Sequence, residues 1–138
     1  MLTTEQLCLS PVDERLQMTV VRSEPGLAVI SMPLTDEVRG FYEGTIHGGM
    51  LATLADAACA GCLWGVYDFG PQFTVTTDIH VRYYRQPKDG PLIAEARMVH
   101  HGKRLLSAEC TIVDATDRVL LRSTATFMLV DAPQSAKR

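Results

Sequence analysis

The sequence lacks the features that mark nucleic-acid-binding and membrane-spanning proteins. Its 138 residues carry 13 Lys and Arg against 16 Asp and Glu, which gives a formal net charge of −3 without any basic run. A nucleic-acid-binding protein normally presents a strongly basic face, so we expect no nucleic-acid partner. The most apolar stretch, Met50 to Val66, is short for a bilayer span and contains Asp56. We therefore expect a buried helix there and no membrane partner.

The sequence is also poor in signals for secretion, thiol chemistry and metal binding. It begins without the positively charged and apolar segments of a signal peptide. Of its four cysteines, Cys59 and Cys62 form a C-x-x-C pair, but no second pair or suitably spaced histidine accompanies them. Both lie inside the apolar run, so we interpret them as small core residues rather than as an exposed redox pair. We expect a reducing cytoplasm and no metal site.

The residues that are present are typical of one globular domain. Hydrophobic residues make up 46% of the chain and charged residues 21%, and no repeat, low-complexity tract or linker divides it. We expect a single domain over residues 1–138 with a sizeable core.

The hydrophobic period changes along the chain and defines the expected elements. Two short strands, an irregular stretch and one long helix come first, at 16–21, 27–32, 33–46 and 47–66. Four strands then follow in hairpin succession, at 73–84, 92–100, 104–113 and 119–130. Because strands joined by short turns pair antiparallel, we predict an α+β fold in which one curved antiparallel sheet wraps around the helix. Apolar residues lie on nearly every side of this helix, so we expect protein to cover it all round.

The start of the predicted helix is the first candidate site. Gly48 and Gly49 follow His47 there. Unpaired N–H groups at a helix N-terminus suit an anion or a developing oxyanion, and glycine lets a substrate approach the backbone closely. The same glycines also fit a tight turn into the helix, and the sequence leaves both interpretations open.

Asp56 is the second candidate, because it lies among Leu54, Ala55, Ala57 and Ala58 on a helix that we expect to be buried. A buried carboxylate is costly unless it is partnered or functional. Its partner could be Thr53 or a neighbouring strand. Where the pocket is partly dry, we predict a raised pKa for Asp56, which makes a carboxylate a better base.

The spacing of the two candidates has a consequence for assembly. Gly48 and Asp56 are eight residues apart, which on one helix means a rise of about 12 Å and a rotation of about 80°. One substrate carbonyl cannot reach both groups of the same chain. If both act on one substrate, they come from two antiparallel helices around a two-fold axis. The catalytic hypothesis therefore predicts a homodimer.

The segment His47–Asp56 resembles the motif of hotdog-fold acyl-CoA thioesterases, most closely the 4-hydroxybenzoyl-CoA and phenylacetyl-CoA (PaaI-like) branch. The segments Thr77–Arg85 and Arg122–Phe127 are also similar to that family, and the match covers roughly residues 12–130. The resemblance implies a hotdog fold and hydrolysis of a thioester to a free acid and coenzyme A (CoA). It implies no cofactor other than the CoA of the substrate.

The resemblance also implies roles for individual residues. The Gly48 amide would polarise the thioester carbonyl, with Gly49 beside it, and Asp56 of the second chain would be the nucleophile or the general base. His47 would shape the start of the helix, and Thr76 stands where such enzymes carry Ser or Thr near the attacking water. One position departs from the family.

That position is Phe41, where many relatives have an Asn or Gln that holds the carbonyl or the water. Tyr42 or Glu43 could take over this role. Basic side chains that flank turns are candidates for binding the CoA phosphates, although each also fits scattered surface charge: Arg85, Lys88, Lys103 and Arg104.

The leading hypothesis is an acyl-CoA thioesterase that works as a homodimer, with a dimer of dimers as the expected further assembly. A hotdog hydratase or dehydratase is less favoured, because such enzymes use a catalytic His with an acid in other motifs. An acyl-CoA-binding module without turnover is the alternative from another class. Phe41 keeps that alternative open, whereas Asp56 on an apolar helix argues against it.

Overall fold

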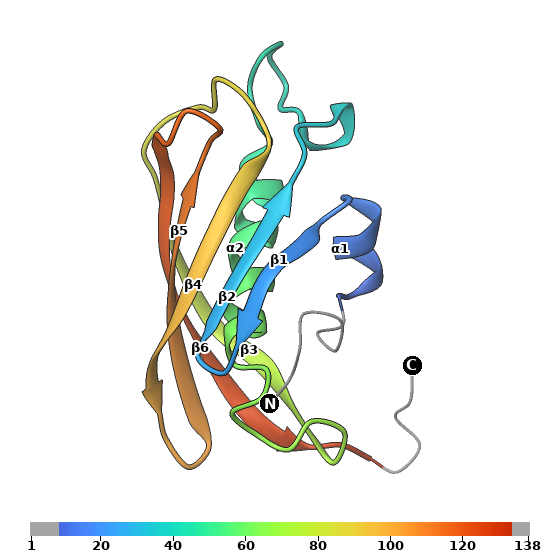
Figure 1. The fold of residues 1–138 in the computed structure, drawn as a ribbon, viewed down its shortest axis with the longest axis vertical. Coiled ribbons are helices and arrows are strands. Elements are labelled where there is room, and N and C mark those ends of the chain that lie inside the picture. Colours follow the sequence, from blue (N-terminus) through green and yellow to red (C-terminus); the bar gives the residue numbers. More distant parts are fainter. Residues whose placement is uncertain (1–8, 134–138) are drawn as a thin grey trace.

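A six-stranded antiparallel sheet curves around one long helix in the computed structural model, which describes residues 9–133 (Figure 1). The helices are α1 (Pro11–Arg15) and α2 (Gly48–Cys62), and a short 3₁₀ turn covers Asp36–Val38. The strands are β1 (Thr19–Glu24), β2 (Leu27–Met32), β3 (Gln72–Tyr83), β4 (Leu92–His101), β5 (Leu105–Val113) and β6 (Val119–Asp131). The predicted α+β architecture is confirmed.

The order of strands in the sheet is β1-β2-β4-β5-β6-β3. Every neighbouring pair is antiparallel, as predicted. The predicted hairpin between the third and fourth strands is wrong, because β3 pairs with β6 at one edge while β4 pairs with β2. Residues 84–91 join β3 to β4 and contain Pro87 and Pro91. A connection of this length is too long for a tight hairpin and carries the chain across the end of the sheet.

The structure also differs from the prediction before the first strand, where it has an additional helix, and at the end of the long helix. Residues 11–15 form α1, so the first strand begins at Thr19 and not at residue 16. A capping box starts α1: the Ser10 hydroxyl accepts from the Asp13 amide, and the Asp13 carboxylate accepts from the Ser10 amide. Helix α2 ends at Cys62, and not at residue 66, because the chain turns there and Gly65 adopts a φ of +92°.

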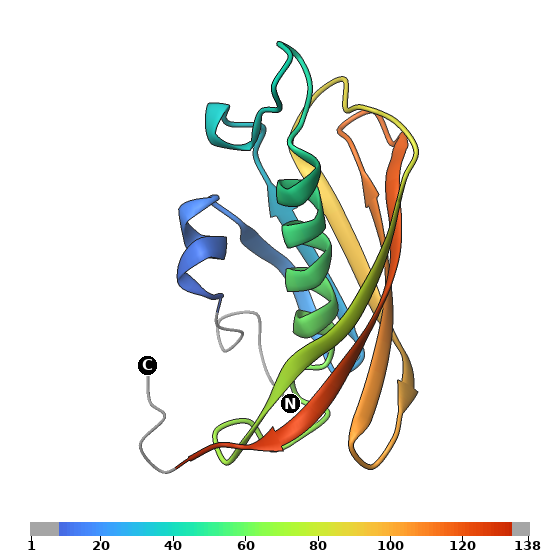
Figure 2. The same cartoon turned by 180° about the vertical axis from the view of Figure 1, so that it is seen from behind.

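The core lies between α2 and the concave face of the sheet (Figure 2). Its large buried side chains each stabilise the fold by about 1.5–3 kcal/mol; they include Ile30, Met32, Leu51, Leu54, Leu92, Leu106, Ile112, Leu121 and Phe127. No helix within residues 9–133 is both long and apolar enough to cross a membrane.

Helix α2 is not covered all round within one chain. One face carries only partly buried residues, among them Thr53, Asp56, Ala57 and Ala60. Helix α1 packs beside this face, but α1 has five residues and none of them is buried. The face is therefore available to a substrate or to a second chain.

Candidate functional site

The start of α2 exposes two unpaired amides. His47 is the N-cap residue, and its Nδ1 accepts a hydrogen bond of 3.3 Å from the Met50 amide. Gly48 and Gly49 occupy the first two helical positions and are exposed, and their N–H groups have no hydrogen-bond partner within the described chain. The positive end of the helix dipole points the same way. These amides can donate hydrogen bonds to a carbonyl oxygen that becomes negatively charged.

Close packing around the two glycines fixes this arrangement. A Cβ at Gly49 would lie 2.9 Å from Cε1 of His47, so a side chain there would displace the capping ring. A Cβ at Gly48 would meet the Tyr83 ring at 3.6 Å, an ordinary contact. The Tyr83 hydroxyl donates a 2.7 Å hydrogen bond to the Gly48 carbonyl and so ties β3 to the helix start.

Tyr83 and Gln86 are the residues near the helix start that sequence reasoning missed. The Gln86 side chain accepts a 2.9 Å hydrogen bond from the Ile46 amide, just before the helix. Each of these residues forms a hydrogen bond with a partner more than thirty positions away in the sequence. No local sequence pattern marks such a contact.

Asp56 lies on the partly covered face of α2, where its Oδ1 accepts a 2.9 Å hydrogen bond from the Thr76 hydroxyl of β3. Burial raises the pKa of Asp56 above 3.8, the hydrogen bond from Thr76 lowers it, and the negative charge of Asp13 raises it; burial prevails. The carboxylate therefore has a neighbouring strand as its partner. The Thr53 hydroxyl donates to the Gly49 carbonyl instead.

A β-bulge in β3 brings Thr76 to this position. Thr76 pairs with Phe127 and Asp78 pairs with Thr126, so Thr77 is the extra residue. Beyond the bulge Ile79 faces the core, and in a regular strand Thr77 would share that face while Thr76 would point away. The strict alternation predicted for residues 73–84 is wrong at this point, because the bulge reverses the faces.

The Asp56 carboxylate lines a pocket of about 320 Å³ between α1, α2 and β3. Its polar lining includes Thr53, Asp56, Thr76 and Asp13, and its apolar wall includes Trp64, Tyr67, Phe69 and Phe73. The rings of Trp64 and Phe69 are tilted against each other with centroids 3.8 Å apart. The pocket combines one raised-pKa carboxylate with room for an apolar group.

The remaining candidates lie outside this pocket. Phe41 and Tyr42 are 95% and 74% exposed in the loop before α2, and their rings meet edge to face. Arg85 and the nearby Lys88 belong to the connection from β3 to β4, at the same end of the sheet as the helix start (Figure 1).

Lys103 and Arg104 lie in the turn between β4 and β5, at the opposite end of the sheet (Figure 1). The structure therefore does not bring these two residues together with the helix start of the same chain. Nor does it bring Gly48 together with Asp56, because both lie on one continuous helix.

No group of three His, Cys, Asp or Glu side chains within residues 9–133 is placed to hold a metal ion. Cys59, Cys62 and Cys110 are buried free thiols. Burial raises the pKa of Cys62, and contact with Cys59 together with burial raises that of Cys110. These thiols pack in the core, as interpreted for the C-x-x-C pair; Cys8 lies outside the described residues.

Comparison with known proteins places this arrangement in a family. The sequence model of the thioesterase superfamily matches residues 43–121, more than half of the chain. The ComA2 protein of Bacillus subtilis is 26% identical over 118 residues, which are 85% of this chain and 92% of that protein.

Solved structures of known proteins have the same fold as this chain. A mutant of a thioesterase enzyme from Staphylococcus aureus is 26% identical and superposes with a TM-score of 0.83 over 87% of this chain and 98% of that one. The PaaI protein of the phenylacetic acid degradation operon of Escherichia coli, at 21% identity, shares the fold with a TM-score of 0.78 over 89% of this chain and 86% of that one. The chain has the hotdog fold and belongs to the thioesterase superfamily.

Proposed function

We propose that the protein hydrolyses acyl-CoA thioesters, with Asp56 as the base or nucleophile. The observation that carries this proposal is the Asp56 carboxylate, which lies in an aromatic-lined pocket with Thr76 as its hydrogen-bond donor. The same helix begins with two unpaired amides, at Gly48 and Gly49. Thioester hydrolysis needs these two elements, a group that activates water and fixed donors for an oxyanion.

The chemistry follows from the residue types. When Asp56 acts as a base, it takes a proton from water while the water oxygen bonds to the thioester carbon. The carbonyl oxygen becomes negatively charged and accepts hydrogen bonds from the helix-start amides. The carbon–sulfur bond then breaks, and the CoA thiolate takes up a proton. When Asp56 acts as a nucleophile, its carboxylate oxygen bonds to the thioester carbon, the carbon–sulfur bond breaks and the CoA thiolate leaves and takes up a proton. Water then cleaves the resulting anhydride, which releases the free acid and restores the Asp56 carboxylate.

The proposal includes a homodimer. Gly48 and Asp56 are separated along one helix by about 12 Å, so a single chain cannot apply both to one carbonyl. The partly covered face of α2 carries small residues, Ala57 and Ala60, next to Asp56. A second α2 packed antiparallel against this face would bring Gly48 of one chain to Asp56 of the other. The Asp56 pocket would then hold the acyl group, and Arg85 and Lys88, beside the helix start, are candidates for the CoA phosphates.

Release of free thiol tests the proposal. Phenylacetyl-, benzoyl-, hexanoyl- and lauroyl-CoA are compared as substrates of the wild type and of Asp56→Asn. The Asn side chain can still accept the Thr76 hydrogen bond but cannot take a proton, so we expect turnover to fall by about 100-fold or more. Full turnover by Asp56→Asn contradicts the assigned role. Tight binding of all four thioesters by a wild type that releases no thiol would instead identify a binding module.

A further inference from the structure

The sheet has a second hollow, on the face that points away from α2, which we call the outer face. The hollow measures about 480 Å³ and is formed by β3, β5 and β6. Strand alternation places its exposed side chains on this face, because their sequence neighbours Val81, Leu121 and Ala125 are directed toward the core. It is therefore separated from the Asp56 pocket by the thickness of the sheet.

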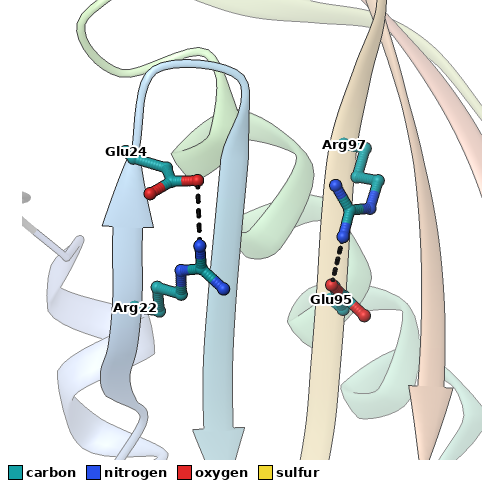
Figure 3. Close-up of polar contacts among 4 residues, drawn as sticks. All are labelled: Arg22, Glu24, Glu95 and Arg97. Atoms are coloured by element: carbon teal, nitrogen blue, oxygen red, sulfur yellow. Dashed lines mark hydrogen bonds and ion pairs between the residues drawn. The ribbon is translucent and has the colours of Figure 1, made fainter.

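Two arginines lie directly opposite each other in this hollow. Arg82 of β3 and Arg122 of β6 are cross-strand partners, and both line the hollow. Like charges in this position destabilise a sheet. Within residues 9–133 neither arginine has an ion-pair partner; the salt bridges there join Arg22 to Glu24 and Arg97 to Glu95, on β1 and β4 (Figure 3). Two adjacent unpaired guanidinium groups are a strong site for an anion with several oxygens.

The other groups of the hollow fit one class of anion. Thr124 lies opposite His80, and Thr111 lies opposite Arg122, so hydroxyls and an imidazole flank the arginines. The Tyr84 ring, 47% exposed, lines the hollow beyond Arg82. An aromatic ring next to an arginine pair matches a ligand with phosphates at one end and a planar base at the other.

Glu109 also lines the hollow, opposite Thr124. It forms no ion pair with either arginine in the described part of the chain. Its carboxylate repels phosphate groups at that end of the hollow. Phosphate groups are therefore bound more favourably at the arginine end. The hollow therefore has a polarity, with the arginines and Tyr84 toward one side.

We propose that Arg82 and Arg122 bind the phosphate groups of a nucleotide on the outer face of the sheet, with Tyr84 stacked against its base. Two sources share this chemistry. One is the nucleotide of a CoA thioester, which rests on the function proposed above; the other is a free nucleotide that the protein binds independently of turnover.

Calorimetric titration with CoA, adenosine 3′,5′-bisphosphate, ADP and pantetheine tests the site directly. We expect wild type to bind the nucleotides but not pantetheine, which has no phosphate. Arg82→Gln and Arg122→Gln should each weaken nucleotide binding by about tenfold. Arg22→Gln is the matched control, because it removes an exposed arginine from the far edge of the same sheet. It should leave nucleotide binding unchanged.

Kinetics distinguish the two sources and separate this site from the proposed function. If the nucleotide is that of the substrate, Arg82→Gln raises KM for an acyl-CoA but not for the corresponding acyl-N-acetylcysteamine, which carries no nucleotide. If it is a free nucleotide, both KM values stay unchanged while binding is lost. Turnover of the N-acetylcysteamine thioester tests hydrolysis alone.

Three results would overturn the site. The first is a wild type that binds none of the nucleotides. The second is an equal loss of binding in Arg22→Gln, which would show a response to net charge only. The third is a change of oligomeric state in Arg82→Gln and Arg122→Gln with unchanged nucleotide affinity, which would identify the hollow as an interface between copies of the chain.

Discussion

Thr76 influences how readily Asp56 loses its proton, because the Thr76 hydroxyl donates a 2.9 Å hydrogen bond to the Asp56 carboxylate and stabilises the ionised form. Burial already raises the pKa of Asp56, and the Thr76 hydrogen bond opposes that rise. Thr76→Val keeps the shape of the side chain and removes the donor, so the pKa of Asp56 should rise further. Because the proposed mechanism requires the ionised form of Asp56, the acid limb of the kcat/KM profile should move to higher pH. Thr76→Ser, which keeps the hydroxyl, should leave the limb in place; an unmoved limb in Thr76→Val would exclude Asp56 as the titrating base.

The two glycines at the helix start should respond differently to alanine. Alanine favours a helix over glycine by up to about 1 kcal/mol at either position. At Gly49 the new Cβ would lie 2.9 Å from Cε1 of His47 and displace the cap, which costs about 1 kcal/mol. We therefore expect Gly49→Ala to be less stable than Gly48→Ala by about 1 kcal/mol in urea unfolding. Equal stabilities would show that the His47 ring moves aside without cost.

At the scale of elements, the turn between β5 and β6 depends on one buried carboxylate. Burial by itself raises the pKa of Asp114, but hydrogen bonds from the Lys88 amide, the Thr116 hydroxyl, and the amides of Arg118 and Thr116 lower it well below 3.8. The pKa of Asp114 is therefore lower in the folded protein than in the unfolded chain. As a result, the ionised carboxylate stabilises the fold fully at pH values above the unfolded pKa. This support is lost as the pH falls below 3.8 toward the folded value.

Asp114→Asn should therefore have a lower Tm than the wild type at pH 7, and the difference should shrink as the pH falls below 3.8. Asp117→Asn is the control from the same turn. Asp117 is exposed with a φ of +64°, a conformation that Asn also tolerates. Its Tm should follow that of the wild type at every pH, and a constant deficit in Asp114→Asn would show that shape and not charge matters there.

Most elements could be predicted from the sequence because their signals are local. The start of α2 and the edges of the later strands follow from hydrophobic period and turn residues, and the structure confirms them within about two residues. Helix α1 was not predicted although Ser10 and Asp13 form a capping box, because its five residues are too few to show a helical spacing of apolar residues. The bulge at Thr77 was missed because one extra residue in β3 changes pairing without changing composition.

At the scale of the whole molecule, the pairing of β3 with β6 could not be predicted from neighbouring residues. It joins strands that are separated in the sequence by β4 and β5, so no turn signal between adjacent segments marks it. The same holds for the candidate site. Gly48, Gly49 and Asp56 are visible in one run of sequence, whereas the contacts of Thr76 and Tyr83 depend on where β3 lies against α2.

The proposed dimer makes a prediction that no single chain could satisfy. Gly48→Pro removes one helix-start amide, and proline suits the first helical position. The preceding residue, His47, has a φ of −69° and a ψ of 121°, which proline permits. Asp56→Asn removes the proposed base. Each variant alone should be inactive, since each lacks one half of both sites.

Co-expression of the two variants with different affinity tags should restore activity. In a mixed dimer, Gly48 of the Asp56→Asn chain meets Asp56 of the Gly48→Pro chain, so one complete site forms. Random pairing makes half of the dimers mixed with one working site of two, which predicts about a quarter of wild-type turnover from the unfractionated mixture. Dimers purified through both tags should reach about half. An inactive doubly tagged dimer would place the amides and the carboxylate of each site in the same chain, and would thus exclude catalysis across the two-fold axis.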